Sequence, residues 1–243
     1  MRAQTVFLPG HGGDEIEAYQ AEPLGDGPYP GVVVVHHMLG YDGPSHEIAR
    51  RFAAHGYLAL MPNLNWRAAP GASADDAAAA ARAAGGVPDD QVVGDIDGVL
   101  RHLRAAGACS GRVAAIGFCS GARQAFLAAC CLPFDAIIDC YGAYIVPTSA
   151  GAWPVSAAPV VHLAGGLSGP LLALSGSLDQ YPCPADLAAL ERSLAAAGKA
   201  GEFHVFEGAR HGFFATNRPN YSPEAAAEGW QRIWDFLDRS LSR

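Results

Sequence analysis

The stretch RVAAIGFCSG, residues 112–121, joins a short apolar run to a cysteine framed by glycines. Residues 113–116 favour a strand, and the alanine-rich sequence that begins at residue 122 favours a helix. A tight strand-to-helix turn leaves no space for side chains two positions before and after its central residue. Gly117 and Gly121 therefore place Cys119, rather than Ser120, at the apex of such a turn. The alternative is a buried cysteine in an ordinary glycine-flanked turn.

Apolar runs of strand length alternate with helical patterns on both sides of this stretch. The predicted strands cover residues 32–35, 58–64, 112–118, 136–142, 170–176 and 202–208. The predicted helices cover residues 45–57, 88–107, 122–131, 186–198 and 222–241, and residues 5–23 form a predicted hairpin. This alternation predicts a single α/β domain over residues 1–243, with a mostly parallel central sheet and helices on both faces.

Two neighbouring segments differ in how clearly they predict a helix. In residues 88–107, Val92, Ile96, Val99 and Leu103 recur at helical spacing and share one face. Residues 66–87 are rich in Ala and Gly and carry little apolar bulk to anchor a helix. This second segment is expected to be either a mobile loop or a lid-like helix.

Composition limits the classes of partner. The net charge is −8, and the 16 Lys and Arg residues are scattered, so we expect no nucleic-acid partner. No apolar run approaches the roughly 18 residues of a membrane span, and the N-terminus has no signal-peptide pattern. The six cysteines form no C-x-x-C pair. These features predict a soluble cytoplasmic protein, a monomer or homodimer that acts on a small molecule without a cofactor or bound metal.

A cysteine nucleophile requires a base, and the base requires an orienting acid. Asp179 follows the strand predicted over residues 170–176, and His211 follows the strand predicted over residues 202–208. In parallel sheets, sites lie at the carboxyl ends of the strands. The chain order of nucleophile, acid and histidine is that of α/β-hydrolases. Asp139 also ends a strand and is the alternative acid.

The motifs that carry this pattern resemble those of the dienelactone hydrolase (carboxymethylenebutenolidase-like) family, which has an α/β-hydrolase fold. The similar stretches are GVVVVHHMLG, IARRFAAHGYLALMPNL, IGFCSG, LALSGSLD and HGFFATNRPNY, at residues 31–40, 48–64, 116–121, 172–179 and 211–221. The resemblance implies a triad of Cys119, Asp179 and His211. It also implies that the backbone N–H groups of Met38 and Ser120 stabilise an oxyanion.

The sequence departs from this family at two places. His37 stands where the family usually has a glutamate that helps to activate the thiol, and Ala215 stands where the family has a carboxylate-binding arginine. Arg82 is a loose match to a second such arginine. We therefore consider His37, Arg82 and Arg123 as candidate substrate-binding residues, and dienelactone itself becomes a doubtful substrate.

The histidine pair also raises the possibility of a metal site. Its ligands would be His36, His37 and His46, with Asp42 or Glu47 as a further ligand. However, adjacent residues of an extended segment point to opposite sides, which argues against a shared ion.

Three functions follow from these residues. The first is hydrolysis of an ester or lactone through a covalent acyl-cysteine intermediate. The second is a thioesterase or tailoring hydrolase that acts on a neutral, bulkier molecule. The third is a ligand-binding protein on a catalytically inactive hydrolase fold, and the apparent triad argues against it.

Overall fold

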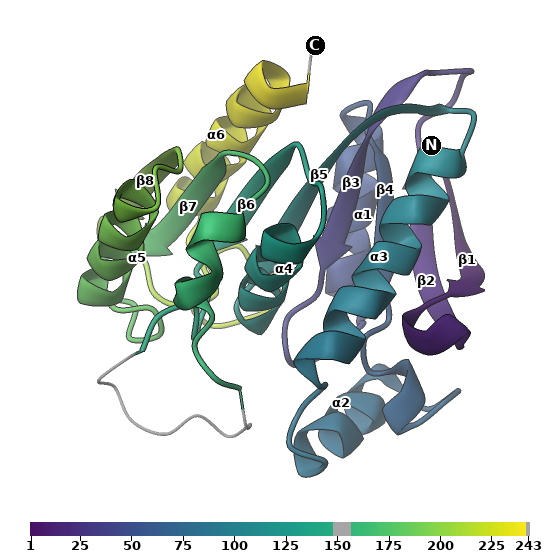
Figure 1. Ribbon diagram of the computed structural model, residues 1–243, viewed down its shortest axis with the longest axis horizontal. Helices are drawn as coiled ribbons and strands as arrows, with labels where there is room; N and C mark the ends of the chain where they lie inside the picture. The colour runs from purple at the N-terminus through teal and green to yellow at the C-terminus, as the bar shows by residue number, and fades with distance from the viewer. Residues whose placement is uncertain (148–156, 242–243) are drawn as a thin grey trace.

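The computed structural model describes residues 1–147 and 157–241, and within them a single mixed sheet runs through the molecule (Figure 1). Its strand order is β1-β2-β4-β3-β5-β6-β7-β8. The strands are β1 (Arg2–Pro9), β2 (Glu15–Glu22), β3 (Tyr29–Val35), β4 (Leu58–Pro62), β5 (Cys109–Phe118), β6 (Ala136–Cys140), β7 (Leu171–Gly176) and β8 (Gly201–Phe206). Strands β1 and β2 form the predicted hairpin, and β2 runs antiparallel to β4. The pairs from β4 through β3 to β8 are parallel.

Helices cover both faces of the sheet, which confirms the predicted α/β architecture. One face is covered by α3 (Asp89–Ala105), α4 (Ser120–Cys131) and α5 (Pro184–Ala196) (Figure 1). The other face is covered by α1 (Gly43–Ala54) and α6 (Pro223–Leu241). Three short 3₁₀ helices are η1 (His11–Gly13), η2 (Trp66–Ala68) and η3 (Val161–Gly166).

Strand β3 shows why the sheet is buried on both sides. Val33 and Val35 belong to the core under α3 and α4, whereas Val32 and Val34 belong to the core under α1 and α6. All four valines have no exposed surface. A continuous β-branched run is therefore the sequence signature of a central parallel strand. This burial holds β3 in the centre of the sheet, and His36 and His37 follow directly after its last residue.

The predicted apolar stripe of α3 lies in the core. Val92, Ile96, Val99 and Leu103 are each at most 1% exposed. Burial of each such side chain stabilises the fold by about 1.5–3 kcal/mol relative to leaving it in water. The packing of α3 against β5 and α4 supports the strand and the helix that flank Cys119.

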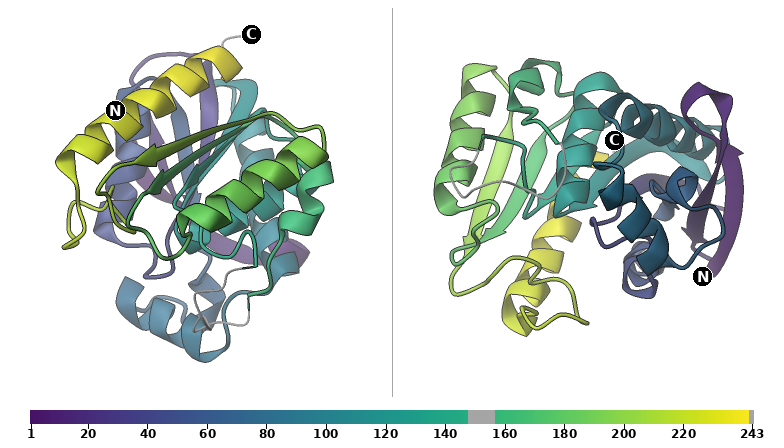
Figure 2. Two further views of the ribbon diagram at one scale, coloured as in Figure 1. Left: turned by 90° about the vertical axis from the view of Figure 1, so that its left-hand side faces the viewer. Right: turned by 90° about the horizontal axis from the view of Figure 1, so that it is seen from below.

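Residues 66–87 contain the helix α2 (Ala74–Ala83), rather than only a loop. The Ser73 hydroxyl caps the first turn by accepting a hydrogen bond from the Asp76 N–H at 3.2 Å. Ala77, Ala78 and Ala81 are buried, so small side chains anchor the helix. Helix α2 lies beyond one end of the strands and covers neither face of the sheet (Figure 2). Among the helices of the described residues, none is both long and apolar enough to cross a membrane.

Candidate active site

The turn between β5 and α4 raises Cys119 out of the sheet. Cys119 has a φ of 55° and a ψ of −122°, a conformation that non-glycine residues rarely adopt. A Cβ on Gly117 would lie 2.1 Å from the Gly121 carbonyl oxygen, and one on Gly121 would lie 2.4 Å from the carbonyl oxygens of Val35 and His36. The two glycines are thus required by close backbone contacts, as the sequence pattern predicted.

Asp179 and His211 come from separate loops and meet beside this turn. Asp179 follows β7, and its two carboxylate oxygens lie 3.0 and 3.2 Å from His211 Nδ1. The buried carboxylate also accepts a hydrogen bond from the Tyr181 N–H at 2.8 Å, which fixes its orientation. His211 follows β8 and interacts with the Cys119 side chain, beside which it lines the larger cavity. The structure therefore brings Cys119, Asp179 and His211 together in one connected group.

The surroundings of His211 favour its protonated form. Burial opposes the positive charge, but the hydrogen bonds with Asp179 and Cys119 outweigh burial and raise the pKa of His211 to about 10. The imidazole is consequently protonated at neutral pH. A protonated His211 beside Cys119 is suited to stabilise a thiolate, the reactive form of cysteine.

Two backbone donors face the same region. Ser120 is the first residue of α4, where an N–H group has no acceptor within the helix. Met38 follows β3 and, like Cys119, lines the large cavity described below. In the part of the chain that the structure describes, neither N–H group donates to a protein acceptor. They are available for the oxygen of a bound carbonyl, as the predicted oxyanion site requires.

Comparison with known proteins decides the family. The model of the dienelactone hydrolase family matches residues 16–241. The chain belongs to the dienelactone hydrolase family. It is 34% identical over 228 residues to an Escherichia coli O157:H7 protein with the provisional name carboxymethylenebutenolidase, covering 93% of this chain and 83% of that protein. It is 33% identical to a Methylorubrum extorquens protein of the same provisional name, covering 91% and 76%.

Solved structures agree with this assignment. The crystal structure of a provisionally named dienelactone hydrolase from Klebsiella pneumoniae superposes with a TM-score of 0.85 and 30% identity, and covers 97% of this chain and 98% of that one. A dienelactone hydrolase-like promiscuous phosphotriesterase, P91, superposes with a TM-score of 0.80 at 22% identity over 98% of both chains, which shows a shared fold. The protein is thus a dienelactone hydrolase-like enzyme of the α/β-hydrolase fold, a hydrolase of esters or lactones.

His37, which replaces the usual glutamate of the family, lies close to the carboxylate of Asp42. His37 Nε2 lies 3.6 Å from Asp42 Oδ2. Asp42 also caps α1 by accepting a hydrogen bond from the Ser45 N–H at 2.9 Å. Burial opposes ionisation of Asp42, but the bonds with His37 and Ser45 hold its pKa well below its usual range. Asp42 therefore places a negative charge beside His37.

The two candidate arginines have different surroundings. Arg82 of α2 donates to the Met38 carbonyl at 3.4 Å and lines the smaller of two cavities. Arg123 of α4 is buried and donates to both carboxylate oxygens of Asp89, at 2.8 and 2.9 Å, and to the Ala158 carbonyl. Asp89 and Ala158 thus hold Arg123 in the wall of the smaller cavity, and its role as a substrate-binding residue stays a prediction.

The side chains of His36 and His37 have different surroundings, as expected for adjacent residues of an extended segment. His36 is buried, its Nε2 accepts from the Leu64 N–H at 3.2 Å, and its Nδ1 donates to the His37 carbonyl at 2.8 Å. Burial lowers the pKa of His36 to about 4, so it is neutral. His37 points into the cavities instead. Within residues 1–147 and 157–241, no three His, Cys, Asp or Glu side chains gather as a metal site would require.

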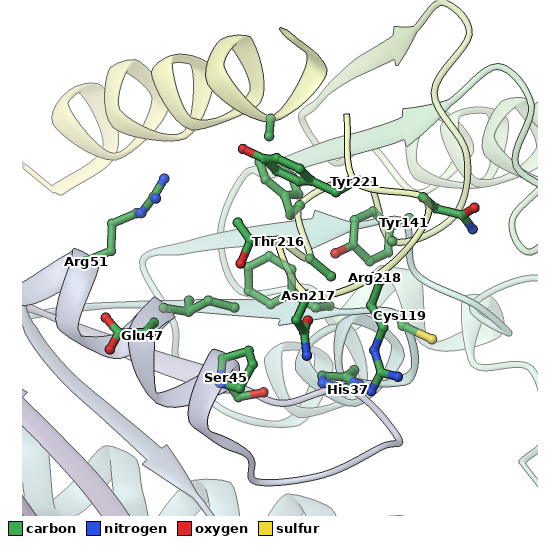
Figure 3. Close-up of a pocket in the computed structure, with 18 of the residues that line it drawn as sticks. His37, Ser45, Glu47, Arg51, Cys119, Tyr141, Thr216, Asn217, Arg218 and Tyr221 are labelled. Carbon is green, nitrogen blue, oxygen red and sulfur yellow. The ribbon is translucent and has the colours of Figure 1, made fainter. Parts of the chain in front are cut away.

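Two cavities lie next to each other and share His37 and Met38 in their walls. The larger, of about 790 Å³, contains Cys119, Tyr141 and His211 and extends between α1 and the loop before α6 (Figure 3). Its apolar wall includes Ile48, Phe118, Phe214 and Trp230. The smaller, of about 430 Å³, lies between α2 and α4 and contains Ser120.

Asp139, the alternative acid, is not the partner of His211. It lies at the end of β6, buried, and its Oδ1 accepts a hydrogen bond from the Gly142 N–H at 2.6 Å. Burial and the nearby charge of Asp179 outweigh that bond and raise the pKa of Asp139 to about 7. Asp139 is therefore a proton-binding group behind the Tyr141–Gly142 turn, a property that the sequence did not reveal.

This pKa predicts a pH-dependent stability. Between about pH 4 and 7, folded Asp139 holds a proton that the unfolded chain releases, so stability falls as pH rises through this window. Asp139→Asn keeps the acceptor for Gly142 and removes the charge. We expect the variant to exceed the wild type in free energy of unfolding by about 1–4 kcal/mol at pH 8, with a much smaller difference at pH 4. Urea unfolding at both pH values measures this.

The exposed Asp26 provides the matched control. Asp26→Asn should leave the free energy of unfolding within about 0.5 kcal/mol of the wild type at both pH values. An Asp139→Asn variant that is less stable than the wild type at pH 8 would contradict the raised pKa.

Proposed function

We propose that the enzyme cleaves an ester or lactone through an acyl-enzyme intermediate on Cys119. The observation that carries the proposal is the hydrogen bonding of Asp179 with His211, which interacts with Cys119, beside two backbone N–H groups that have no protein acceptor among the described residues. A protonated imidazole next to the thiol supplies both a stabilised nucleophile and a proton donor.

The first half of the reaction forms the acyl enzyme. The Cys119 thiolate attacks the substrate carbonyl, and the Met38 and Ser120 N–H groups bind the oxygen that becomes negative. Each such donor lowers the barrier by about 2.7–4 kcal/mol in a related oxyanion site. As the tetrahedral intermediate collapses, the C–O bond to the leaving group breaks, and protonated His211 donates its proton to the departing alkoxide.

The second half releases the acid. His211 is now neutral, because it has given up its proton, and it can accept one from a water molecule. The hydroxide that results attacks the acyl carbon, and the C–S bond breaks to regenerate the thiolate. Asp179 keeps the imidazole in one orientation and stabilises its charge in both halves.

Trapping the intermediate tests the proposal. Rapid acid quenching during turnover of p-nitrophenyl acetate, followed by peptide mass spectrometry, should locate one acetyl group on Cys119. Cys131 is exposed at the end of α4 and serves as the internal control, since it should stay unmodified. Turnover without any acyl group on Cys119 would refute covalent catalysis by this residue. Binding without turnover would instead favour the non-catalytic, ligand-binding alternative.

The size and wall of the larger cavity favour a second candidate, a neutral and bulkier ester or thioester. A cavity of about 790 Å³ with aromatic and aliphatic walls accommodates more than a small anionic lactone. We expect kcat/KM to increase from p-nitrophenyl acetate to p-nitrophenyl octanoate by about tenfold or more. A preference for an anionic lactone over a neutral ester of similar size would reject this candidate.

A further inference from the structure

The smaller cavity contains a buried amide without a partner. Asn65, which follows β4 at the start of η2, is 6% exposed and lines this cavity. Its backbone N–H is satisfied by Asn63 Oδ1 at 3.2 Å. Its side-chain Nδ2, however, is buried and has no hydrogen-bond partner among the residues that the structure describes. A buried donor without an acceptor costs stability, and it becomes satisfied only if something else supplies an oxygen.

The position of this amide connects it with the reaction site. A Cβ built on Gly40 would lie 3.6 Å from Asn65 Nδ2, so the amide lies against the loop that carries His37 and Met38. Ser120, whose N–H is the other proposed oxyanion donor, lines the same cavity as Asn65. If the carbonyl oxygen of an ester binds at the N–H groups of Met38 and Ser120, one half of the ester, either acyl or alcohol, can enter the smaller cavity.

Other residues of this cavity also carry N–H donors. Arg82 has a single long bond to the Met38 carbonyl, and Gln124 contributes a side-chain amide. The one carboxylate in the wall, Asp89, is already held by both terminal nitrogens of Arg123. Among the described residues of its wall, the cavity therefore has no free carboxylate, and it offers several N–H groups. Its complement is a group that carries acceptor oxygen.

We propose that Asn65 is a specificity-determining residue, which donates a hydrogen bond to an acceptor oxygen of the substrate in the smaller cavity. The substrate class is an ester that carries a further neutral oxygen, as a carbonyl, hydroxyl or ether, a few bonds from the scissile carbonyl. This inference rests on the proposed function of Cys119 and adds the requirement for a second oxygen. A site built to donate to such an oxygen discriminates against the analogue that lacks it.

Two pairs of esters of equal length test the proposal. p-Nitrophenyl methoxyacetate and p-nitrophenyl butyrate differ by an oxygen in the acyl half, and 2-methoxyethyl acetate and butyl acetate differ by an oxygen in the alcohol half. The measured quantity is the kcat/KM ratio of the oxygenated to the plain ester. Comparing this ratio between wild type and Asn65→Leu removes the intrinsic reactivity of each ester from the result.

We expect Asn65→Leu to lower the ratio by about tenfold or more in one of the two pairs, which also identifies the half that enters the smaller cavity. The control is Gln231→Leu, because Gln231 is exposed on α6 and lines neither cavity, and its ratios should equal those of the wild type. Ratios in Asn65→Leu that stay within about twofold of the wild type for both pairs would overturn the proposal.

A second readout separates recognition from a structural role. Leu has a similar volume and removes the unpaired donor, so Asn65→Leu should unfold at a temperature no lower than the wild type. A structural asparagine would give the reverse, a lower unfolding temperature with unchanged ratios. If Asn65→Leu does not fold, Asn65→Asp keeps the shape and replaces the donor with an acceptor, and the same fall in ratio is expected.

Failure of this inference is distinguishable from failure of the proposed function. Cys119→Ala is assayed on all four esters. If Cys119→Ala retains wild-type turnover, the proposed function fails, whatever the effect of Asn65→Leu. If Cys119→Ala is inactive and both ratios are unchanged in Asn65→Leu, the role of Asn65 fails alone.

Discussion

Replacing Cys119 with alanine is expected to lower kcat/KM for p-nitrophenyl acetate by at least about 10³-fold, while leaving the fold intact. Alanine removes the sulfur that bonds to the acyl group, but the flanking Gly117 and Gly121 keep the turn. Steady-state hydrolysis at pH 7.5 measures the loss, and circular dichroism checks the fold. Cys131→Ala is the matched control, because this cysteine is exposed and lies at the far end of α4. Wild-type turnover by the Cys119→Ala variant would refute the nucleophile.

The serine variant adds a pH test of the same site. In Cys119→Ser, the hydroxyl must lose its proton to a neutral imidazole before it can attack. The hydrogen bond with Asp179 still favours protonated His211, so the neutral form increases as the pH rises. We expect the residual activity of Cys119→Ser to rise steadily between pH 6 and pH 9. A flat profile over this range would argue against a raised pKa at His211.

Replacing Gly121 with alanine is expected to lower kcat/KM by at least about 100-fold and the free energy of unfolding by about 1–3 kcal/mol. The added Cβ would lie 2.4 Å from the carbonyl oxygens of Val35 and His36, and backbone atoms cannot move aside as a flexible side chain can. The start of α4 must then shift away from β3. This shift separates the Ser120 N–H from the Met38 N–H and weakens the proposed oxyanion site.

The measurements are ester hydrolysis and urea unfolding of Gly121→Ala beside Gly107→Ala. Gly107 follows α3 and is exposed, and a Cβ there would meet no atom within 4 Å. The same substitution at this position should leave activity unchanged and stability within about 0.5 kcal/mol. Equal behaviour of the two variants would show that close contact at Gly121 does not hold the turn.

The strand-to-helix turn at Cys119 could be predicted from the sequence because its constraints are local. Gly117, Cys119 and Gly121 interact through a turn of a few residues, and the steric reason for both glycines is the same in any strand-to-helix turn of this type. The strands and the α3 stripe were predictable for a similar reason, since burial imposes a period on neighbouring residues. The segment 66–87 was harder, because alanines indicate a helix without indicating what the helix packs against.

The site residues also differ in how far the sequence could predict their roles. The chain order and strand positions of Cys119, Asp179 and His211 pointed to one group before any distance was known. Arg123 gave no sign of its partner, because Asp89 lies 34 residues away. Asp42 behind His37 was named only as a metal ligand, and nothing in the sequence distinguished Asn65 from other polar loop residues.

The sequence by itself indicated the family, the positions of the strands and helices along the chain, and the identity of the cysteine at the turn. These features depend on local sterics and on the periodicity of apolar side chains, and both can be read from residues that are close in sequence. Only the tertiary structure decided which charges are paired, that Asp139 is buried beside Asp179, and that Asn65 Nδ2 has no partner among the described residues. Partners and burial are set by segments distant in sequence, and they control the pKa of a group and its freedom to bind a substrate.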